Sequence, residues 1–169
     1  KRENGLGSIS TVYVAALVQF RLRSGVYSGA KKFSQIETIY GGLNGIEGIM
    51  KEKLVDLSPI LDEGNNLELL KNTPSSFLGS CRYKLKGFDV AEDEYKRIFE
   101  VFEKFNIKYF FYIGGNDSMD TVLRLKQYQA EKNMGVTVIG VPKTIDNDLY
   151  EVDHTPGFGS AAKYIATTI

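Results

Sequence analysis

The sequence has no net charge, no pair of cysteines and no long apolar run, and each absence argues against one class of protein. Among its 169 residues, 21 basic side chains balance 21 acidic ones, which argues against a nucleic-acid-binding surface built on bulk positive charge. Cys81 is the single cysteine. It has no partner for an internal disulfide, so we expect a cytoplasmic protein from a reducing compartment. The apolar run Val12–Val18 is far shorter than the ~20 residues of a membrane-spanning helix, so we expect no membrane segment.

Glycine is abundant instead, with 17 glycines against four prolines. The apolar share of 43% and the charged share of 25% are those of an ordinary soluble domain. The length suits about one domain. The first residues have no signal-peptide pattern. The last ones lie inside an expected helix, so we expect the natural protein to continue beyond Ile169.

Apolar patterns in the second half predict two strands with helices between and around them. Ile107–Ile113 is short, aromatic and nearly all apolar, which favours a strand buried on both faces of a parallel sheet. Val136–Val141 is a second apolar run, ended by Pro142. A helix is expected over Ala91–Phe105, where apolar residues recur at helical spacing. Another is expected over Ser118–Lys132, which is rich in helix-forming residues.

The helix expected over residues 91–105 has one apolar stripe and an expected N-cap at Asp89. The stripe consists of Tyr95, Ile98, Val101, Phe102 and Phe105. A further helix is expected to begin at Ser160, after Gly157-Phe158-Gly159.

The first half gives weaker signals. Strands are expected at Val12–Val18 and Ile36–Tyr40, the second ended by Gly41-Gly42, and a short helix at Ile46–Lys53. Residues 56–77 are polar and rich in turn residues, which predicts a loop with little regular structure. The alternation of strands and helices predicts an α/β fold, a Rossmann-like, mostly parallel sheet flanked by helices.

The loop after the first central strand is a candidate phosphate cradle. Ligands bind at the carboxyl ends of parallel strands, and this loop begins with Gly114-Gly115, followed by Asn116, Asp117 and Ser118. Glycines let the backbone approach a ligand closely, and the next helix presents unpaired N–H groups. The alternative interpretation is a tight turn in which Asp117 or Ser118 is a helix N-cap.

The loop after the second strand concentrates polar groups over residues 142–148. Asp146 and Asp148 flank Asn147, so in an extended stretch the two carboxylates share a face. Such a pair is able to hold Mg²⁺, or one member is able to act as a general base. The alternative interpretation is a solvated turn with local capping hydrogen bonds.

Together these segments resemble the phosphofructokinase family, over residues 24–169. The matching motifs are Ile39–Gly48, Leu78–Arg82, Tyr112–Thr121, Pro142–Asp148 and Thr155–Ala161. The resemblance implies the N-terminal part of the phosphofructokinase fold and phosphoryl transfer to fructose 6-phosphate, giving fructose 1,6-bisphosphate in glycolysis.

Residues 117 and 143 occupy the two positions that distinguish members of the family by their phosphoryl donor. Members that use ATP typically have glycine where this chain has Asp117 and Lys143, whereas members that use pyrophosphate have aspartate and lysine. A carboxylate at residue 117 would repel a nucleotide's α-phosphate, and like charges 4 Å apart interact by ~4 kcal/mol at an effective dielectric constant near 20. The resemblance therefore implies pyrophosphate, with ATP as the alternative donor. We expect Asp117 and Lys143 to share one pocket.

The resemblance also implies a role for each site residue. Asp146 is the expected general base, and Thr144 places the sugar or the transferred group. Asp148 orients the substrate. The implied catalytic residues are thus Asp146, Thr144 and Lys143, and the implied substrate-binding residues are Thr144, Asp146 and Asp148. The implied donor-binding residues are Gly115, Asn116, Asp117 and Arg82. Mg²⁺ is the implied cofactor, and Asn116 and Asp117 are its expected ligands.

Two departures from the family pattern shape the domain assignment. The family's Gly-Gly-Pro-Thr loop should fall near Gln19–Arg23, where this chain has no glycine. Residues 1–23 are therefore expected to be a divergent segment, by true divergence, a non-native leader or a frame slip. The second departure is truncation, because the family's sugar-phosphate-binding half should follow residue 169. Residues 24–169 are therefore expected to be the donor half of a domain truncated at its C-terminus, inactive alone and part of a homo-oligomer when full length. A non-catalytic subunit or remnant of the same fold is the third interpretation.

Overall fold

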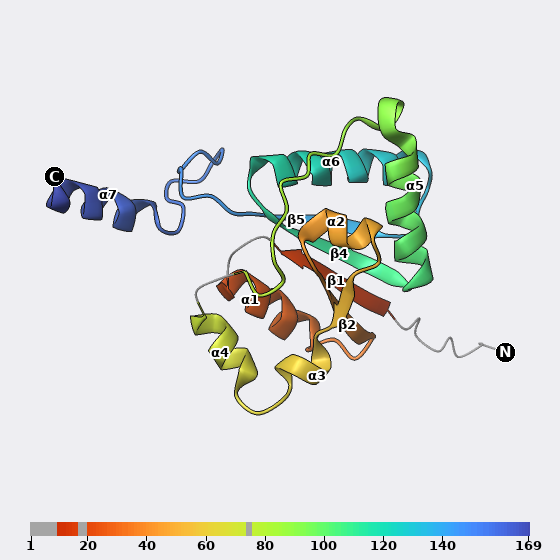
Figure 1. Ribbon diagram of the computed structural model, residues 1–169, viewed down its shortest axis with the longest axis horizontal. Coiled ribbons are helices and arrows are strands. Elements are labelled where there is room, and N and C mark those ends of the chain that lie inside the picture. The colour runs from red at the N-terminus through yellow and green to blue at the C-terminus, as the bar shows by residue number, and fades with distance from the viewer. Residues whose placement is uncertain (1–9, 17–19, 74–75) are drawn as a thin grey trace.

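The computed structural model describes residues 10–16, 20–73 and 76–169, which form one five-stranded sheet with helices on both faces (Figure 1). The strand order is β3-β2-β1-β4-β5. The central strand β1 pairs in parallel with β2 and β4, β4 pairs in parallel with β5, and β3 is antiparallel at the edge. The strands are β1 (Ser10–Ala16), β2 (Ile36–Gly42), β3 (Leu54–Asp56), β4 (Ile107–Gly114) and β5 (Thr137–Pro142). The expected α/β fold with a mostly parallel sheet is confirmed.

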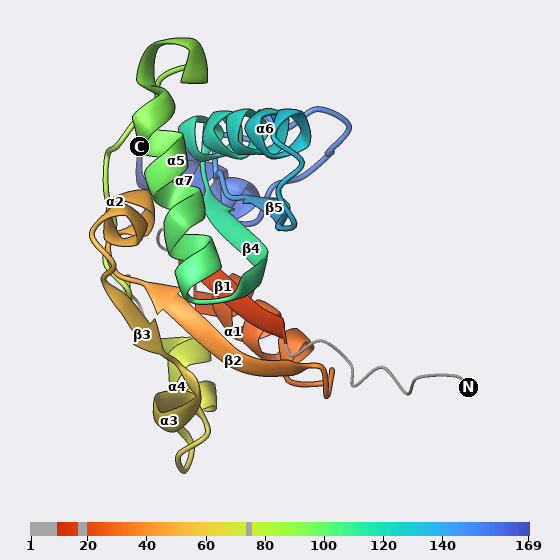
Figure 2. The same cartoon turned by 90° about the vertical axis from the view of Figure 1, so that its right-hand side faces the viewer.

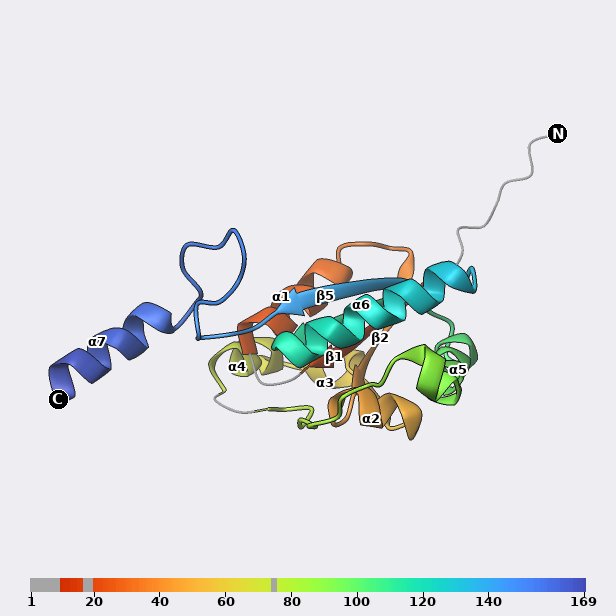
Figure 3. The same ribbon diagram turned by 90° about the horizontal axis from the view of Figure 1, so that it is seen from above.

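The helices form two layers and one projecting end. Figures 1 and 2 show α2, α5 and α6 on one side of the sheet and α1 with α4 on the other. The last helix, α7, extends away from the sheet (Figure 3), and its residues are exposed or half-buried. The helices are α1 (Phe20–Ala30), α2 (Gly45–Met50), α3 (Ser58–Leu61), α4 (Asn66–Asn72), α5 (Phe88–Lys104), α6 (Asn116–Glu131) and α7 (Phe158–Thr168).

The larger core lies between the sheet and the α2, α5, α6 layer. The expected stripe of α5 is buried here, with Phe99 added and Phe105 only partly buried. Phe102 packs its ring 5.0 Å from that of Phe110 on β4, centroid to centroid. Each fully buried large side chain of this kind stabilises the fold by about 1.5–3 kcal/mol, so α5 is fixed over the central strands. Gly87, and not Asp89, occupies the N-cap position, and Asp89 lies inside the first turn.

The prediction of an irregular loop over residues 56–77 was wrong, because α3 and α4 lie there. Leu61 and Leu70 are buried in a second core with Tyr27 of α1. These helices have four and seven residues, too short to be stable alone, so packing against α1 determines them. The local composition of residues 56–77 gives no sign of this packing.

Two further strand predictions need correction. The β2 strand runs through Gly41-Gly42 instead of ending there, and a Cβ on Gly41 would lie 2.8 Å from the Leu78 side chain. The expected burial of β4 on both faces is wrong, because Tyr109 is 38% exposed. Tyr109 helps line an apolar hollow of about 530 Å³ beside α1 and β5.

Part of the N-terminal expectation lies outside the described residues. The first strand ends at Ala16, and residues 17–19 are not described. The helix α1 begins at Phe20. Residues 20–23, where the family's glycine loop was expected, are therefore helical. In the part of the chain that the structure describes, no helix is both long and apolar enough to cross a lipid bilayer.

Tyr27 joins α1 to the end of α3 through a hydrogen bond with Asp62, the C-cap of α3. Its hydroxyl donates to Asp62 Oδ1 at 2.6 Å, and Lys31 Nζ lies 2.7 Å from Asp62 Oδ2. Burial, and then the bond to Asp62, raise the pKa of Tyr27 to about 12, whereas Lys31 and then Tyr27 lower the pKa of Asp62.

We expect Tyr27→Phe to lower the free energy of unfolding by about 1–2 kcal/mol, because Asp62 loses a buried donor. The Tyr27 pKa is raised above its ordinary 10.0, so its stabilising contribution is complete below pH 10 and is lost as the pH rises toward 12. The variant should therefore lose less stability than the parent across this range. Denaturant unfolding at several pH values tests this, with the exposed Tyr150→Phe as control. Equal alkaline losses in parent and variant would contradict the account.

Candidate functional site

The two predicted loops lie side by side at the carboxyl edge of the sheet. In the parallel pairing of β4 with β5, Gly114 is in register with Pro142. The amide N–H of Lys143 donates to the carbonyl oxygen of Gly114 at 2.7 Å. The backbone therefore holds the start of one loop directly against the start of the other.

The first loop passes straight into α6. Gly115 occupies the N-cap position, and its carbonyl oxygen accepts the amides of Ser118 and Met119, each at 3.0 Å. Asp117 and Ser118 lie inside the helix, so the alternative interpretation of either as N-cap is wrong. A Cβ on Gly115 would lie 3.6 Å from the Lys143 carbonyl oxygen, an ordinary contact. The fold itself therefore leaves room for a side chain at residue 115.

The second loop is held by Asn147, which sequence reasoning did not assign to the site. Asn147 has φ of +57°, and its side-chain oxygen accepts the backbone N–H of buried Thr155 at 2.8 Å. Asparagine tolerates this left-handed conformation better than most residues, which is the signal that the sequence offered. The stretch is therefore not extended, and the expectation that Asp146 and Asp148 share a face on that ground was wrong.

The two aspartates have different contacts. The backbone N–H of Asp146 donates to Thr144 Oγ1 at 2.9 Å. Asp148 reaches across to the first loop, where Asn116 Nδ2 donates to its Oδ2 at 3.0 Å. Hydrogen bonds from Asn116 first, and from Thr144 second, lower the pKa of Asp148. Asp148 thus links the two loops as a carboxylate, an ionised state favoured by its lowered pKa.

The predicted site residues other than Asp148 line two adjoining hollows. One, of about 410 Å³, is lined by Cys81, Arg82, Tyr83, Lys84, Tyr112, Gly115, Asn116, Asp117 and Ser118. The other, of about 370 Å³, is lined by Gly115, Asn116, Lys143, Thr144, Ile145 and Asp146. Gly115 and Asn116 belong to both.

The expected shared pocket of Asp117 and Lys143 is divided in the structure. Asp117 lines the first hollow, and Lys143 lines the second beside Asp146. The cation paired with Asp117 is Lys84, whose Nζ lies 3.3 Å from Asp117 Oδ1. Lys84 was not predicted as a site residue, because its partner Asp117 lies 33 positions away in the sequence.

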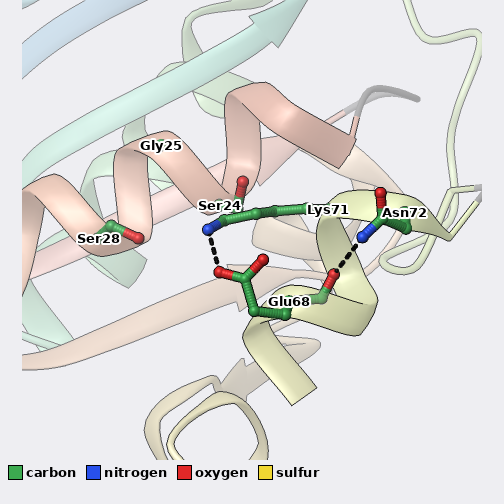
Figure 4. Close-up of a pocket in the computed structure, with 6 residues that line it drawn as sticks. All are labelled: Ser24, Gly25, Ser28, Glu68, Lys71 and Asn72. Carbon is green, nitrogen blue, oxygen red and sulfur yellow. Dashed lines mark hydrogen bonds and ion pairs between the residues drawn. The ribbon is translucent and has the colours of Figure 1, made fainter. Parts of the chain in front are cut away.

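A hollow of about 490 Å³ between α1 and α4 contains none of the predicted residues (Figure 4). Lys71 forms an ion pair with Glu68, and Asn72 Nδ2 donates to the Glu68 carbonyl oxygen at 3.0 Å. Lys71 and Glu68 are the only charged residues among the described ones that line this hollow, so it offers a phosphate no excess of positive charge.

The expected metal ligands are engaged with other side chains. Asn116 donates to Asp148, and Asp117 is paired with Lys84. Among residues 10–16, 20–73 and 76–169, no three His, Cys, Asp or Glu side chains gather so as to hold a metal ion. The structure thus offers an amide oxygen and single carboxylates at the site, and not a cage made by protein ligands alone.

Comparisons with known proteins agree on one family. The phosphofructokinase family profile matches residues 22–169. The pyrophosphate–fructose 6-phosphate 1-phosphotransferase of Halomonas elongata is 48% identical over 134 residues, which are 79% of this chain and 32% of the relative. The protein of the same name from Methylococcus capsulatus is 43% identical over 146 residues, 86% of this chain and 34% of the relative.

A solved structure extends the likeness to three dimensions. The pyrophosphate-dependent phosphofructokinase from Nitrosospira multiformis superposes with a TM-score of 0.79 and 40% identity. The match covers 96% of this chain and 40% of that chain. The chain thus spans about a third of the length of the curated relatives it matches.

We expect Asn116→Ala to raise the pKa of Asp148 toward its ordinary value, because the largest cause of its lowering is removed. A pH titration of the Asp148 side-chain carboxyl carbon by NMR measures this. Gln127→Ala removes an exposed amide from the same helix and should leave the titration unchanged. An unaltered Asp148 pKa in Asn116→Ala would show that the link between the loops does not exist in solution.

Proposed function

The chain belongs to the phosphofructokinase family, and we propose that the intact protein transfers a phosphoryl group from pyrophosphate to fructose 6-phosphate. The products are fructose 1,6-bisphosphate and orthophosphate. Two relatives named for this reaction are 43% and 48% identical. The single observation that carries the proposal is the carboxylate of Asp117 in the first hollow, beside Arg82 and Gly115, because it opposes a nucleotide and leaves room for a compact donor.

The proposed reaction is an in-line displacement at one phosphorus of pyrophosphate. The sugar O1 forms a bond to this phosphorus while the bond from phosphorus to the bridging oxygen breaks. Asp146 accepts the O1 proton, and orthophosphate leaves. Thr144 places the reacting groups, and Lys143, which lines the same hollow, stabilises negative charge on the transferred group. Asp148, joined to Asn116, holds the two loops in register.

Mg²⁺ fits this donor set as an ion held mainly by the substrate. Proteins commonly bind Mg²⁺ through one or two carboxylate or amide oxygens, with phosphates and water completing the shell. Asn116, in the wall common to both hollows, and Asp117, in the first hollow, offer such oxygens. When bound, Mg²⁺ would neutralise charge on the phosphate oxygens. To hold the ion, Asp117 would give up its ion pair with Lys84.

The remaining parts of the proposal concern the setting of the reaction. We propose a cytoplasmic enzyme of glycolysis, consistent with the single cysteine. Residues 24–169 are proposed as the donor half of the enzyme, and residues 1–23 as a divergent segment. Exposed apolar side chains on α7, such as Tyr164 and Ile165, support burial of this helix against further protein and a homo-oligomer.

Asp146→Asn in the intact protein should reduce kcat by about 10²–10⁴-fold, because the general base is lost. The KM for each substrate should change little. Asp153→Asn removes an exposed carboxylate from the same loop region and serves as control. Release of orthophosphate in a coupled assay measures the rates. A kcat for Asp146→Asn within about threefold of the parent would favour a non-catalytic protein.

The double variant Asp117→Gly, Lys143→Gly should relax the preference for pyrophosphate over ATP. The two residues line different hollows, so the single variants should separate their effects. Asp117→Gly should admit ATP, whereas Lys143→Gly should mainly weaken turnover with pyrophosphate. The ratio of kcat/KM for the two donors measures this. An unchanged ratio in the double variant would remove these residues from donor selection.

A further inference from the structure

We propose that Lys84 binds the phosphate of pyrophosphate that is not transferred, and that Asp117 positions Lys84 for this task. This inference rests on the proposed function. Lys84 Nζ lies 3.3 Å from Asp117 Oδ1, and the two side chains are 69% and 75% exposed. Both line the first hollow. The ammonium is thus held at the place that an incoming anion would reach.

The backbone around Lys84 is anchored by its neighbours. Leu85 is buried in the larger core, and Tyr83 packs against that core. Burial first, and a hydrogen bond with Glu94 second, raise the pKa of Tyr83 to about 12. Exposure alternates along this stretch, so Arg82 and Lys84 lie on its exposed side while Tyr83 and Leu85 point inward. Lys84 is therefore presented to the hollow by a fixed backbone, and only its flexible side chain has to move.

The charges in the hollow favour a phosphate. Arg82 and Lys84 supply two cations against the single carboxylate of Asp117 among the lining side chains. The hollow also includes the first turn of α6, where N–H groups and the helix dipole favour anions. Exposed ion pairs are weak, so Asp117 holds Lys84 in place without preventing its transfer to a more highly charged phosphate.

The two hollows suggest one arrangement of the donor. Gly115 and Asn116 form a wall common to both. The second hollow holds Asp146 and Lys143, which the proposed reaction places beside the transferred group. The phosphate that is not transferred then lies in the first hollow, beside Arg82 and Lys84. Asp117 has a double role in this arrangement, because it repels a nucleotide and orients the lysine that binds the smaller donor.

Lys84→Ala in the intact protein should raise the KM for pyrophosphate by about tenfold, the loss of one charged contact. The KM for fructose 6-phosphate and the denaturant midpoint should stay unchanged. Lys84→Arg should recover most of the affinity. Lys86→Ala is the matched control, because it removes an exposed lysine two positions along the same stretch, outside the lining residues. An unchanged pyrophosphate KM in Lys84→Ala, or equal rises in both KM values, would overturn the inference.

A double-mutant cycle tests the positioning by Asp117. The fold-change caused by Lys84→Ala should shrink to less than about half when Asp117→Asn is already present. An equal fold-change in both backgrounds would overturn the positioning role. Failure of the proposed function gives a separate result, because the parent protein would then neither bind pyrophosphate in calorimetry nor turn it over. A parent that uses pyrophosphate together with an unaffected Lys84→Ala would overturn only the role of Lys84.

Discussion

The parallel pairing of β4 with β5 is the constraint on which the site depends. It places Gly114 in register with Pro142, and the hydrogen bond from Lys143 N–H to the Gly114 carbonyl oxygen continues the pairing one residue beyond the strand. Both loops therefore leave the same edge in contact. The buried aromatic core under β4 fixes the strand, so the positions of the loops follow from hydrophobic packing far from any charged group.

Long periodic segments were predictable because their signal is local. The burial of α5 and the strands at the centre of the sheet follow from spacing within one segment. In contrast, α3 and α4 depend on contacts of Leu61 and Leu70 with Tyr27, more than 30 residues away. No window of sequence contains both partners. The same reason explains why β3 and the burial on one face of β4 were not predicted correctly.

For the candidate site, the sequence indicated that two loops leave the same edge of the sheet but not which of their side chains meet. The pairs Asn116–Asp148 and Lys84–Asp117 each join segments more than 30 residues apart. The left-handed conformation of Asn147 turns the second loop and separates the surroundings of the two aspartates. The residues of each loop can be read from the sequence, whereas their contacts cannot. The division into two adjoining hollows, with cations in each, emerged only from the three-dimensional arrangement.

In the proposed function, charge placed at short range in a small space selects the donor. A carboxylate at the first turn of α6 costs little in the free protein, because it is exposed and paired with a lysine. The same carboxylate is unfavourable for a nucleotide, whose additional groups would crowd it. The most direct measurement is kcat/KM of the intact protein with pyrophosphate and with ATP, at saturating fructose 6-phosphate. The account predicts a preference for pyrophosphate of about a hundredfold or more, and equal or better use of ATP would contradict it.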